Sequence, residues 1–202
     1  LAWNTGERPV LLKGTPLKSV NQYYNKQMAK RRSICERMNG RHSSKRIARL
    51  TVKRNRKVED YLHKASRKVI DLCAGQDVSV LVIGKNKGWK QEANLGRKLN
   101  QSFVQLPFAR FIQMLQYKAE SIGMKVVLTE ESYTSGTSFL DDEAPVKACY
   151  DKSRRVHRGL FLANDGQRIN ADVNGAYQIM RKVFPNVNAD GIEGVALRPA
   201  VV

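Results

Sequence analysis

The sequence predicts an α/β fold: a mixed sheet with flanking helices, interrupted by a basic helical hairpin at about residues 16–75. Three observations support this fold class. Two apolar, β-branched segments, from Val78 to Gly84 and from Lys125 to Glu131, are typical of buried strands. A segment of helical periodicity separates them, and two long segments rich in Lys and Arg precede both.

The composition indicates a globular protein with a polyanionic partner. The 202 residues are 42% apolar, which suffices for one core, with or without a helical appendage. The 36 Lys and Arg residues outnumber the 18 Asp and Glu residues and give a net charge of +18. Nucleic acid is therefore the leading candidate for the partner, and an anionic membrane surface is the second. No apolar run could cross a bilayer and no signal-peptide pattern is present, so we expect no membrane partner and a cytoplasmic location, nucleoid-associated in a prokaryote.

The basic hairpin has start and stop signals for two helices. Thr15 and Pro16 suit the N-cap and first turn of a helix from about Leu17 to Met38, and the Asn-Gly pair at residues 39–40 ends it. Ser43 or Ser44 can cap the second helix. Its apolar residues recur at helical spacing and form one stripe: Ile47, Leu50, Val58, Tyr61, Ala65, Val69 and Leu72.

The charge of this hairpin has almost one sign. Between Lys26 and Lys57 every charged residue is basic except Glu36. A solvated helix face usually mixes both signs, so the pattern favours contact with nucleic-acid phosphates. The residues that we predict to make this contact are Lys45, Arg46, Arg49, Lys53 and Arg56.

The remainder of the chain reads as strand, helix, strand, helix. In "PFARFIQMLQYKAESIGM" the apolar residues share one helical face, as in an amphipathic crossover helix, so the two flanking strands should be parallel neighbours. "LAWNT" and "PVLLKG" suggest a hairpin that feeds the same sheet, and "DVNGAYQIMRKVF" predicts a last helix that ends before Pro185. The face predicted for the crossover helix consists of Phe108, Phe111, Ile112, Leu115, Ala119 and Ile122.

The loop after the first of these strands is a second candidate for nucleic-acid contact. Ligands tend to bind at the carboxyl ends of strands in open α/β sheets. Trp89 is available there for base stacking, although a solvated loop with Trp89 packed on the sheet is an equal alternative. The basic residues that could form a phosphate track in this loop are Lys85, Lys87, Lys90, Arg97 and Lys98.

The order of these segments resembles a known family. The hairpin, "VLVIG", "QLPFARFIQMLQYKAESIGMKVVLTEESYTS" and "ADVNGAYQI" together resemble the RuvC-like nuclease domain of OrfB/TnpB proteins, which are transposon-encoded, RNA-guided DNA endonucleases often called transposases. The resemblance covers nearly the whole of residues 1–202 and implies an RNase H-like fold, with DNA and a guide RNA as partners. It also implies metal-dependent phosphodiester hydrolysis with Mg²⁺ or Mn²⁺.

The resemblance implies three catalytic carboxylates, of which this chain offers two candidates. Asp172 matches the Asp of the last helix; a simple helix cap is its alternative role, and the small residues Gly175 and Ala176 would permit close packing of this helix on the sheet. The Glu expected at the end of "VLVIG" is replaced by Gly84, but part of the family carries a Glu at the end of the next strand. Glu131 is favoured for this role from the ExYTS spacing, with Glu130 as the alternate, because only one of two successive side chains can face the site.

Two features of the family pattern are missing. The family's first strand, with its Asp, would precede Leu1, so we expect either a fragment or a degenerate copy that binds without cutting. The family's CxxC pairs are absent too, because the cysteines Cys35, Cys73 and Cys149 are far apart, and we expect no zinc site. Whether the chain is an enzyme stays open at this point. The alternatives are an inactive nucleic-acid-binding remnant of the family and an unrelated basic RNA-binding protein such as a ribosomal component.

Overall fold

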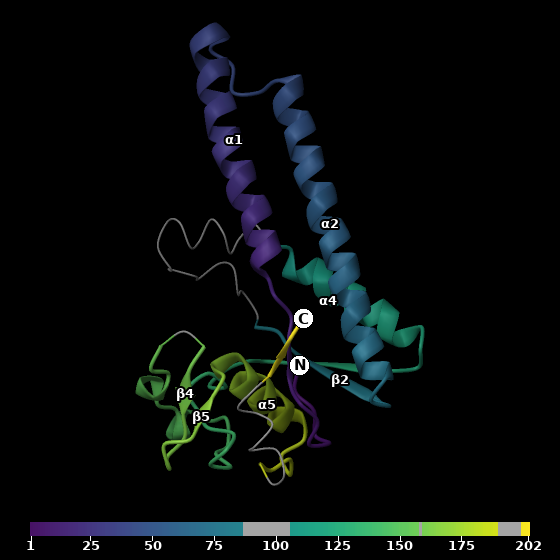
Figure 1. The fold of residues 1–202 in the computed structure, drawn as a ribbon, viewed down its shortest axis with the longest axis vertical. Coiled ribbons are helices and arrows are strands. Elements are labelled where there is room, and N and C mark those ends of the chain that lie inside the picture. The colour runs from purple at the N-terminus through teal and green to yellow at the C-terminus, as the bar shows by residue number, and fades with distance from the viewer. Residues whose placement is uncertain (87–105, 158, 190–198) are drawn as a thin grey trace. The chain divides into compact units, whose positions relative to one another are not determined.

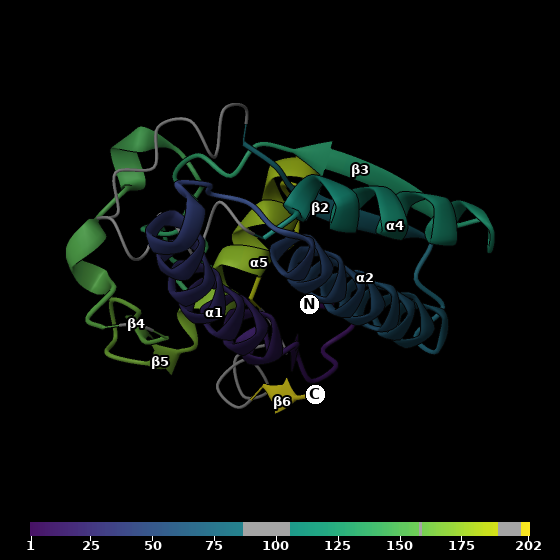
Figure 2. The same cartoon turned by 90° about the horizontal axis from the view of Figure 1, so that it is seen from above.

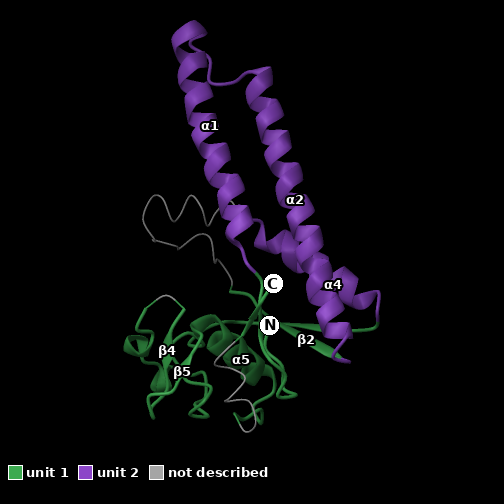
Figure 3. Cartoon of the chain, in the orientation of Figure 1, with its two compact units in different colours: residues 1–12, 78–89, 123–202 green, residues 13–77, 90–122 purple. Residues whose placement is uncertain are grey.

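The computed structural model describes residues 1–86, 106–157, 159–189 and 199–202. The chain forms two compact units (Figure 3). Unit 1 comprises residues 1–12, 78–89 and 123–202, and unit 2 comprises residues 13–77 and 90–122, in each case as far as they are described. None of the helices in the described ranges combines the length and apolar character that a bilayer crossing requires.

Unit 2 contains the predicted helical hairpin, whose two helices are α1 (Thr15–Asn39) and α2 (Lys45–Ala74) (Figure 1). The stop signal is confirmed, because Gly40 ends α1 in the left-handed conformation with φ 66°. Ser44 caps α2 by accepting a hydrogen bond from the Ile47 N–H at 3.3 Å. The predicted N-cap of α1 was wrong by one residue, because Gly14 holds that position and Thr15 already belongs to the helix.

The third helix of unit 2, α4 (Phe108–Glu120), packs against α2, and the two helices run side by side in Figure 2. Its Met114 is fully buried and forms a core with Leu17, Val58 and Leu62. The predicted face was right for Ile112, Leu115 and Ala119, which are buried. It was wrong for Ile122, which lies beyond the end of the helix and is 48% exposed.

Unit 1 contains the predicted pair of parallel strands, β2 (Val80–Gly84) and β3 (Lys125–Thr129). Their register pairs Val80 with Lys125 and Gly84 with Thr129, so both strands end at the same edge. The expectation that the first strand is buried on both faces was too strong. Only its Leu81 is buried, and the other four residues of β2 are half-buried in this sheet, which has two strands among the described residues.

The other strands of unit 1 are short. β1 (Val10–Leu11) pairs in parallel with β6 (Ala200–Val201), and β4 (Phe161–Leu162) pairs antiparallel with β5 (Arg168–Ile169). The chain start does fold back, since Leu1 and Val10 exchange two backbone hydrogen bonds. The prediction that this hairpin feeds the sheet of β2 and β3 was wrong, because the backbone groups around β1 are bonded to Leu1 and to the segment of β6.

The last helix, α5 (Ala171–Val183), contributes Ala171, Val173 and Tyr177 to the core of unit 1 and contacts both β2 and β3. Its Tyr177 stacks on Phe139 with ring centroids 4.4 Å apart. Two short 3₁₀ helices, η1 (Lys147–Cys149) and η2 (Lys152–Arg154), precede β4. The prediction of a helix that stops before Pro185 is confirmed.

Candidate functional site

The carboxyl ends of β2 and β3 bring together the segments that the sequence singled out. The backbone N–H of Lys85 donates to the Thr129 carbonyl at 2.7 Å, which continues the pairing beyond the strands. One residue later, Oδ1 of Asn86 accepts a hydrogen bond from the Glu131 N–H at 2.7 Å. The backbone of Glu131 is therefore fixed next to the end of β2.

The side chain of Glu131 lies directly over Gly84. A Cβ atom added to Gly84 would lie 2.5 Å from both Cγ and Oε1 of Glu131, and 2.8 Å from Cδ1 of Ile179 in α5. Distances below about 3 Å do not occur between such atoms, so no residue other than glycine fits here without displacing its neighbours. The carboxylate of Glu131 thus occupies the space where a side chain at position 84 would begin.

The negative charge of the Glu131 carboxylate has little stabilisation in this position. It is half-buried, and burial raises its pKa above the ordinary value for Glu. No residue in the described ranges donates a hydrogen bond to its carboxylate, whereas its backbone carbonyl accepts from the hydroxyl and the N–H of Thr134 at 2.9 and 3.3 Å. A half-buried carboxylate without donors is available to a cation.

Glu130 has the opposite environment. Its carboxylate accepts a hydrogen bond from the Ser132 hydroxyl at 2.5 Å and from Nζ of Lys182 at 3.0 Å. The Ser132 hydrogen bond, followed by Lys182, lowers the pKa of Glu130. Its side chain is 69% exposed, so the two successive glutamates lie in different environments, as alternation along an extended chain requires.

Asp172 lies in the first turn of α5 but does not cap it. Asn170 is the cap, and its Oδ1 accepts from the N–H groups of Asp172 at 2.9 Å and Val173 at 3.3 Å. The Asp172 side chain is 72% exposed and lies 3.7 Å from Nη2 of Arg155. Asn170 therefore fills the cap role considered for Asp172, and the Asp172 carboxylate does not cap the helix.

The position of Asp172 relative to Glu131 can be followed along α5. Ile179, which lies against Gly84 beside Glu131, follows Asp172 by seven residues, or about 10 Å along the helix. The expected close approach at Gly175 is wrong, because a Cβ there would meet nothing within 4 Å. No group of three His, Cys, Asp or Glu side chains that could hold a metal ion occurs in the described part of the chain.

The segment after the YTS motif is held by ion pairs that the sequence patterns did not indicate. Nη1 of Arg154 donates to Oε1 of Glu143 at 2.6 Å, its Nη2 pairs with Asp141, and its Nε donates to the Leu162 carbonyl at 3.1 Å. From α5, Nη2 of Arg181 pairs with Asp142 at 2.6 Å. Cys149 is a free, half-buried thiol in this segment.

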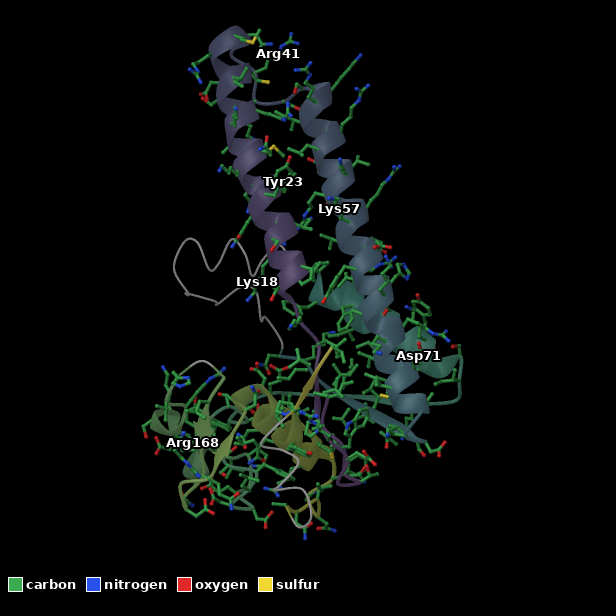
Figure 4. The ribbon with its side chains drawn as sticks, in the orientation of Figure 1. Lys18, Tyr23, Arg41, Lys57, Asp71 and Arg168 are labelled. Atoms are coloured by element: carbon green, nitrogen blue, oxygen red, sulfur yellow. The ribbon has the colours of Figure 1, made fainter. Side chains whose placement is uncertain are left out.

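The predicted nucleic-acid contacts of the hairpin are solvent-exposed. The structure gives these side chains no hydrogen bond or ion pair with any described residue: Lys45, Arg46, Arg49, Lys53 and Arg56. Further along α2 the acidic residues are paired, since Asp60 binds Lys64 and Asp71 binds Arg67, both at 2.8 Å. Basic and aromatic side chains labelled along the hairpin in Figure 4 include Lys18, Tyr23, Arg41 and Lys57.

The second candidate for nucleic-acid contact is described only at its start. Lys85 is exposed directly after β2. Lys87, Trp89, Lys90, Arg97 and Lys98 lie outside the described residues.

The environments of Glu130 and Glu131 predict opposite effects on stability. The raised pKa of Glu131 means that its ionised form destabilises the fold, a cost absent below the ordinary Glu pKa of about 4.3 and complete above the raised value. Glu131→Gln should therefore raise Tm at neutral pH. The lowered pKa of Glu130 gives a stabilisation present above the ordinary pKa and lost as pH falls through the lowered value, so Glu130→Gln should lower Tm at neutral pH.

Thermal melts of both variants in a metal chelator test this prediction. The comparison is made at neutral pH and again at a pH below both folded pKa values, where both differences should disappear. Shifts of the same sign at neutral pH would contradict the assignment of the two environments.

Comparisons with known proteins agree with these features. Residues 1–90 match the OrfB_IS605 family, described as a probable transposase, and residues 108–179 match the Cas12f1-like TNB domain. The chain is similar to the CRISPR-associated endodeoxyribonuclease Cas12f2 of Micrarchaeota archaeon (strain CG1_02_47_40), with 24% identity over 189 residues, 89% of this chain and 33% of that protein. It thus spans about a third of the length of this relative.

The fold is also similar to a solved structure. A chain in the cryo-EM structure of a Cas12f1–sgRNA–target DNA complex matches with a TM-score of 0.53 and 20% identity, over 78% of this chain and 40% of the other. The two family matches together include both β2 and β3 and most of α5. These findings support a resemblance of the chain to the OrfB/TnpB-type family of transposon-associated proteins.

Proposed function

We propose that this chain is the nuclease portion of an RNA-guided DNA endonuclease that hydrolyses phosphodiester bonds with the help of divalent metal ions. Its match to the OrfB_IS605 family over residues 1–90 and its likeness to a chain solved with sgRNA and target DNA support the proposal. The net charge of +18 and the exposed basic residues in the first half of α2 supply the affinity for both nucleic acids; these residues are Lys45, Arg46, Arg49, Lys53 and Arg56.

The observation that carries the proposal is the position of the Glu131 carboxylate over Gly84. The resemblance places a catalytic Glu at the end of the strand that β2 forms, where this chain has glycine. The carboxylate from the next strand reaches the same place, because neighbouring strands lie about 4.8 Å apart and Gly84 leaves room for it. The Glu131 carboxylate therefore occupies the space that a side chain at Gly84 would fill.

Glu131 and Asp172 are the residues that would hold Mg²⁺ or Mn²⁺, because both ions prefer hard oxygen ligands. Bound ions would stabilise the charge that develops on the attacking and leaving oxygens of the phosphodiester. The donor set of the described residues fits this role only in part, because it supplies two carboxylates and no third. The proposal requires that third carboxylate from outside the described residues, as the resemblance implies for the family's first strand.

The second candidate function is nucleic-acid binding without cutting, and one observation favours it. The Asp172 carboxylate lies 3.7 Å from the Arg155 guanidinium, which is itself 39% exposed and positioned to compete with a metal ion. A family member that no longer cuts would retain the Asp172–Arg155 pair together with the basic residues of α2.

Cleavage by the assembled complex separates the two functions. For this test, an Asp-bearing strand from a relative is fused to the N-terminus of the chain. The fusion is expressed in cells that also transcribe the DNA flanking its gene, and it is purified with the RNA that stays bound. We expect this complex to cut DNA matching that RNA in Mg²⁺ or Mn²⁺ and not in a chelator.

Three substitutions assign the roles of the carboxylates. Asp172→Ala and Glu131→Gln should each abolish cutting while DNA binding persists, and Glu130→Gln should leave cutting intact. We expect the 202-residue chain by itself not to cut. Binding without cutting in every version of the fused complex would favour the non-cutting function, and equal cutting by wild type and Glu131→Gln would refute the assignment of Glu131.

A further inference from the structure

A hollow of about 430 Å³ opens beside the end of β3 in unit 1. Its lining comes from three segments of the chain: Glu130 and Tyr133 after β3, Pro145 to Lys147 before and in η1, and Lys182 near the end of α5. The volume falls within the range of about 300–1,000 Å³ that small-ligand sites occupy. Glu130, in the lining of the hollow, directly precedes Glu131 in the sequence.

Tyr133 is held in this hollow with its ring partly exposed. Its φ of 64° places it in the left-handed region, which residues with a bulky side chain rarely adopt. Tyr133 is 39% exposed, and its ring lies edge to face with that of Tyr150, at a centroid distance of 5.8 Å. The surrounding structure therefore maintains an unfavourable backbone conformation that keeps an aromatic ring at the surface.

Tyr150, which supports the Tyr133 ring, is itself held in place by close packing. A Cβ atom added to Gly136 would lie 2.5 Å from Cε2 of Tyr150, so Tyr150 packs directly on the glycine backbone. The N–H of Asp151 donates to the Gly136 carbonyl at 2.9 Å and fixes the same contact. Only a glycine at position 136 lets Tyr150 approach closely enough to support Tyr133.

The charges of the hollow favour an anion on one side. Glu130 is neutralised by Lys182, whose Nζ also donates a 2.8 Å hydrogen bond to the Ser132 hydroxyl. Lys147 is exposed, and the structure gives its ammonium no hydrogen bond or ion pair with any residue in the described ranges. One lysine is thus left to bind an incoming anion next to an aromatic ring.

We propose that this hollow binds one nucleotide of a single-stranded nucleic acid, with the base stacked on Tyr133 and a flanking phosphate paired with Lys147. Stacking on an aromatic ring together with a phosphate contact is how proteins hold single strands without reading their sequence. A duplex does not fit this role, because its bases are stacked on one another. The inference rests on the proposed function in one respect: the strand held by Tyr133 would be the one presented to Glu131, two residues away.

The test uses the 202-residue chain in a metal chelator, with two fluorescein-labelled DNA single strands that have the same number of phosphates. One strand carries its bases and the other is abasic. Phosphate contacts of the helical hairpin act equally on both strands, so the ratio of the two Kd values isolates stacking. The variants are Tyr133→Gly, which suits the positive φ, Tyr133→Phe, which keeps the ring, and Lys147→Ala.

We expect Tyr133→Gly to weaken binding of the base-containing strand roughly 5-fold or more and to leave the abasic strand unaffected. Tyr133→Phe should bind like wild type. Lys147→Ala should weaken both strands equally, whereas Lys125→Ala, which removes the same charge at the other end of β3, should weaken neither. An unchanged Kd ratio in Tyr133→Gly would overturn the inference, and so would a loss in Tyr133→Phe equal to that in Tyr133→Gly.

The result is independent of cutting. If Tyr133→Gly loses stacking but the fused complex does not cut in any version, the nucleotide site stands and the proposed function fails. If Tyr133→Gly binds normally and Glu131→Gln is inactive, the proposed function stands and the nucleotide site fails.

Discussion

Replacing Lys45, Arg49 and Lys53 together by Gln will weaken nucleic-acid binding by roughly 10- to 100-fold at low salt. These residues follow one another at i, i+4 and i+8 along α2, so they share one helical face. All three side chains are exposed, and none is paired with an acid among the described residues. Each therefore releases a counterion from the nucleic acid when it binds a phosphate.

The salt dependence of nucleic-acid binding makes this prediction quantitative. The slope of log K against log salt concentration should fall by about 3, one for each phosphate contact removed. Fluorescence anisotropy with double-stranded and single-stranded DNA at several salt concentrations measures it. The loss should be similar for unrelated DNA sequences, because phosphate contacts carry no sequence information.

A matched control lies on the same helix. Replacing Lys64, Arg67 and Lys68 by Gln removes the same charge from the second half of α2, where Asp60 and Asp71 already hold two of the three. We expect a smaller change in the slope from this variant. Equal effects of the two triple variants would show that only net charge matters and that the first half of α2 is not a distinct binding face.

The local signals in the sequence predicted the hairpin and the parallel strand pair well, and the reason is physical. Gly40 and Ser44 act on the backbone within a few residues, so their effect can be recognised without knowing the rest of the fold. The parallel pairing of β2 and β3 follows from the rules for a strand, a crossover and a second strand. These features depend on short stretches of the chain.

The packing partner of α4 could not be predicted in the same way. Periodicity shows that Ile112 and Ala119 are buried, but it does not show what covers them. The sequence predicted a crossover helix between the two strands, and the structure shows that this helix, α4, packs against α2 within unit 2. Likewise, Arg154 meets Asp141 and Glu143 from an irregular loop in which no period relates the three residues.

The sequence nominated residues for the candidate site but not the geometry that surrounds them. The motif order singled out Glu131 and Asp172, but only the coordinates show that Glu131 lies over Gly84, 47 positions away in sequence. They also place Arg155 beside Asp172, a contact for which the sequence holds no spacing rule. Residues that position a catalytic group come from distant segments, and no local pattern relates them.

Substituting Gly84 by Ala will abolish most of the cutting activity while leaving the protein folded. The added Cβ would lie 2.5 Å from Cγ and Oε1 of Glu131, so the carboxylate must rotate away from its place. Both that side chain and the tip of Ile179 are flexible, which keeps the cost in stability small. Displacing the carboxylate should greatly slow cutting, since a displacement of about 1 Å can reduce the rate 10²-fold.

The effect should appear in kcat and not in DNA binding, as measured with the fused complex and its matching DNA. The decisive comparison exchanges the two residues: Gly84→Glu combined with Glu131→Gly returns a carboxylate to the same edge of the sheet from the neighbouring strand. We expect this double variant to recover part of the activity that Glu131→Gly alone loses, with Tm close to that of wild type. Full activity of Gly84→Ala, with a Tm that shows normal folding, would mean that the carboxylate over Gly84 does not take part in cutting.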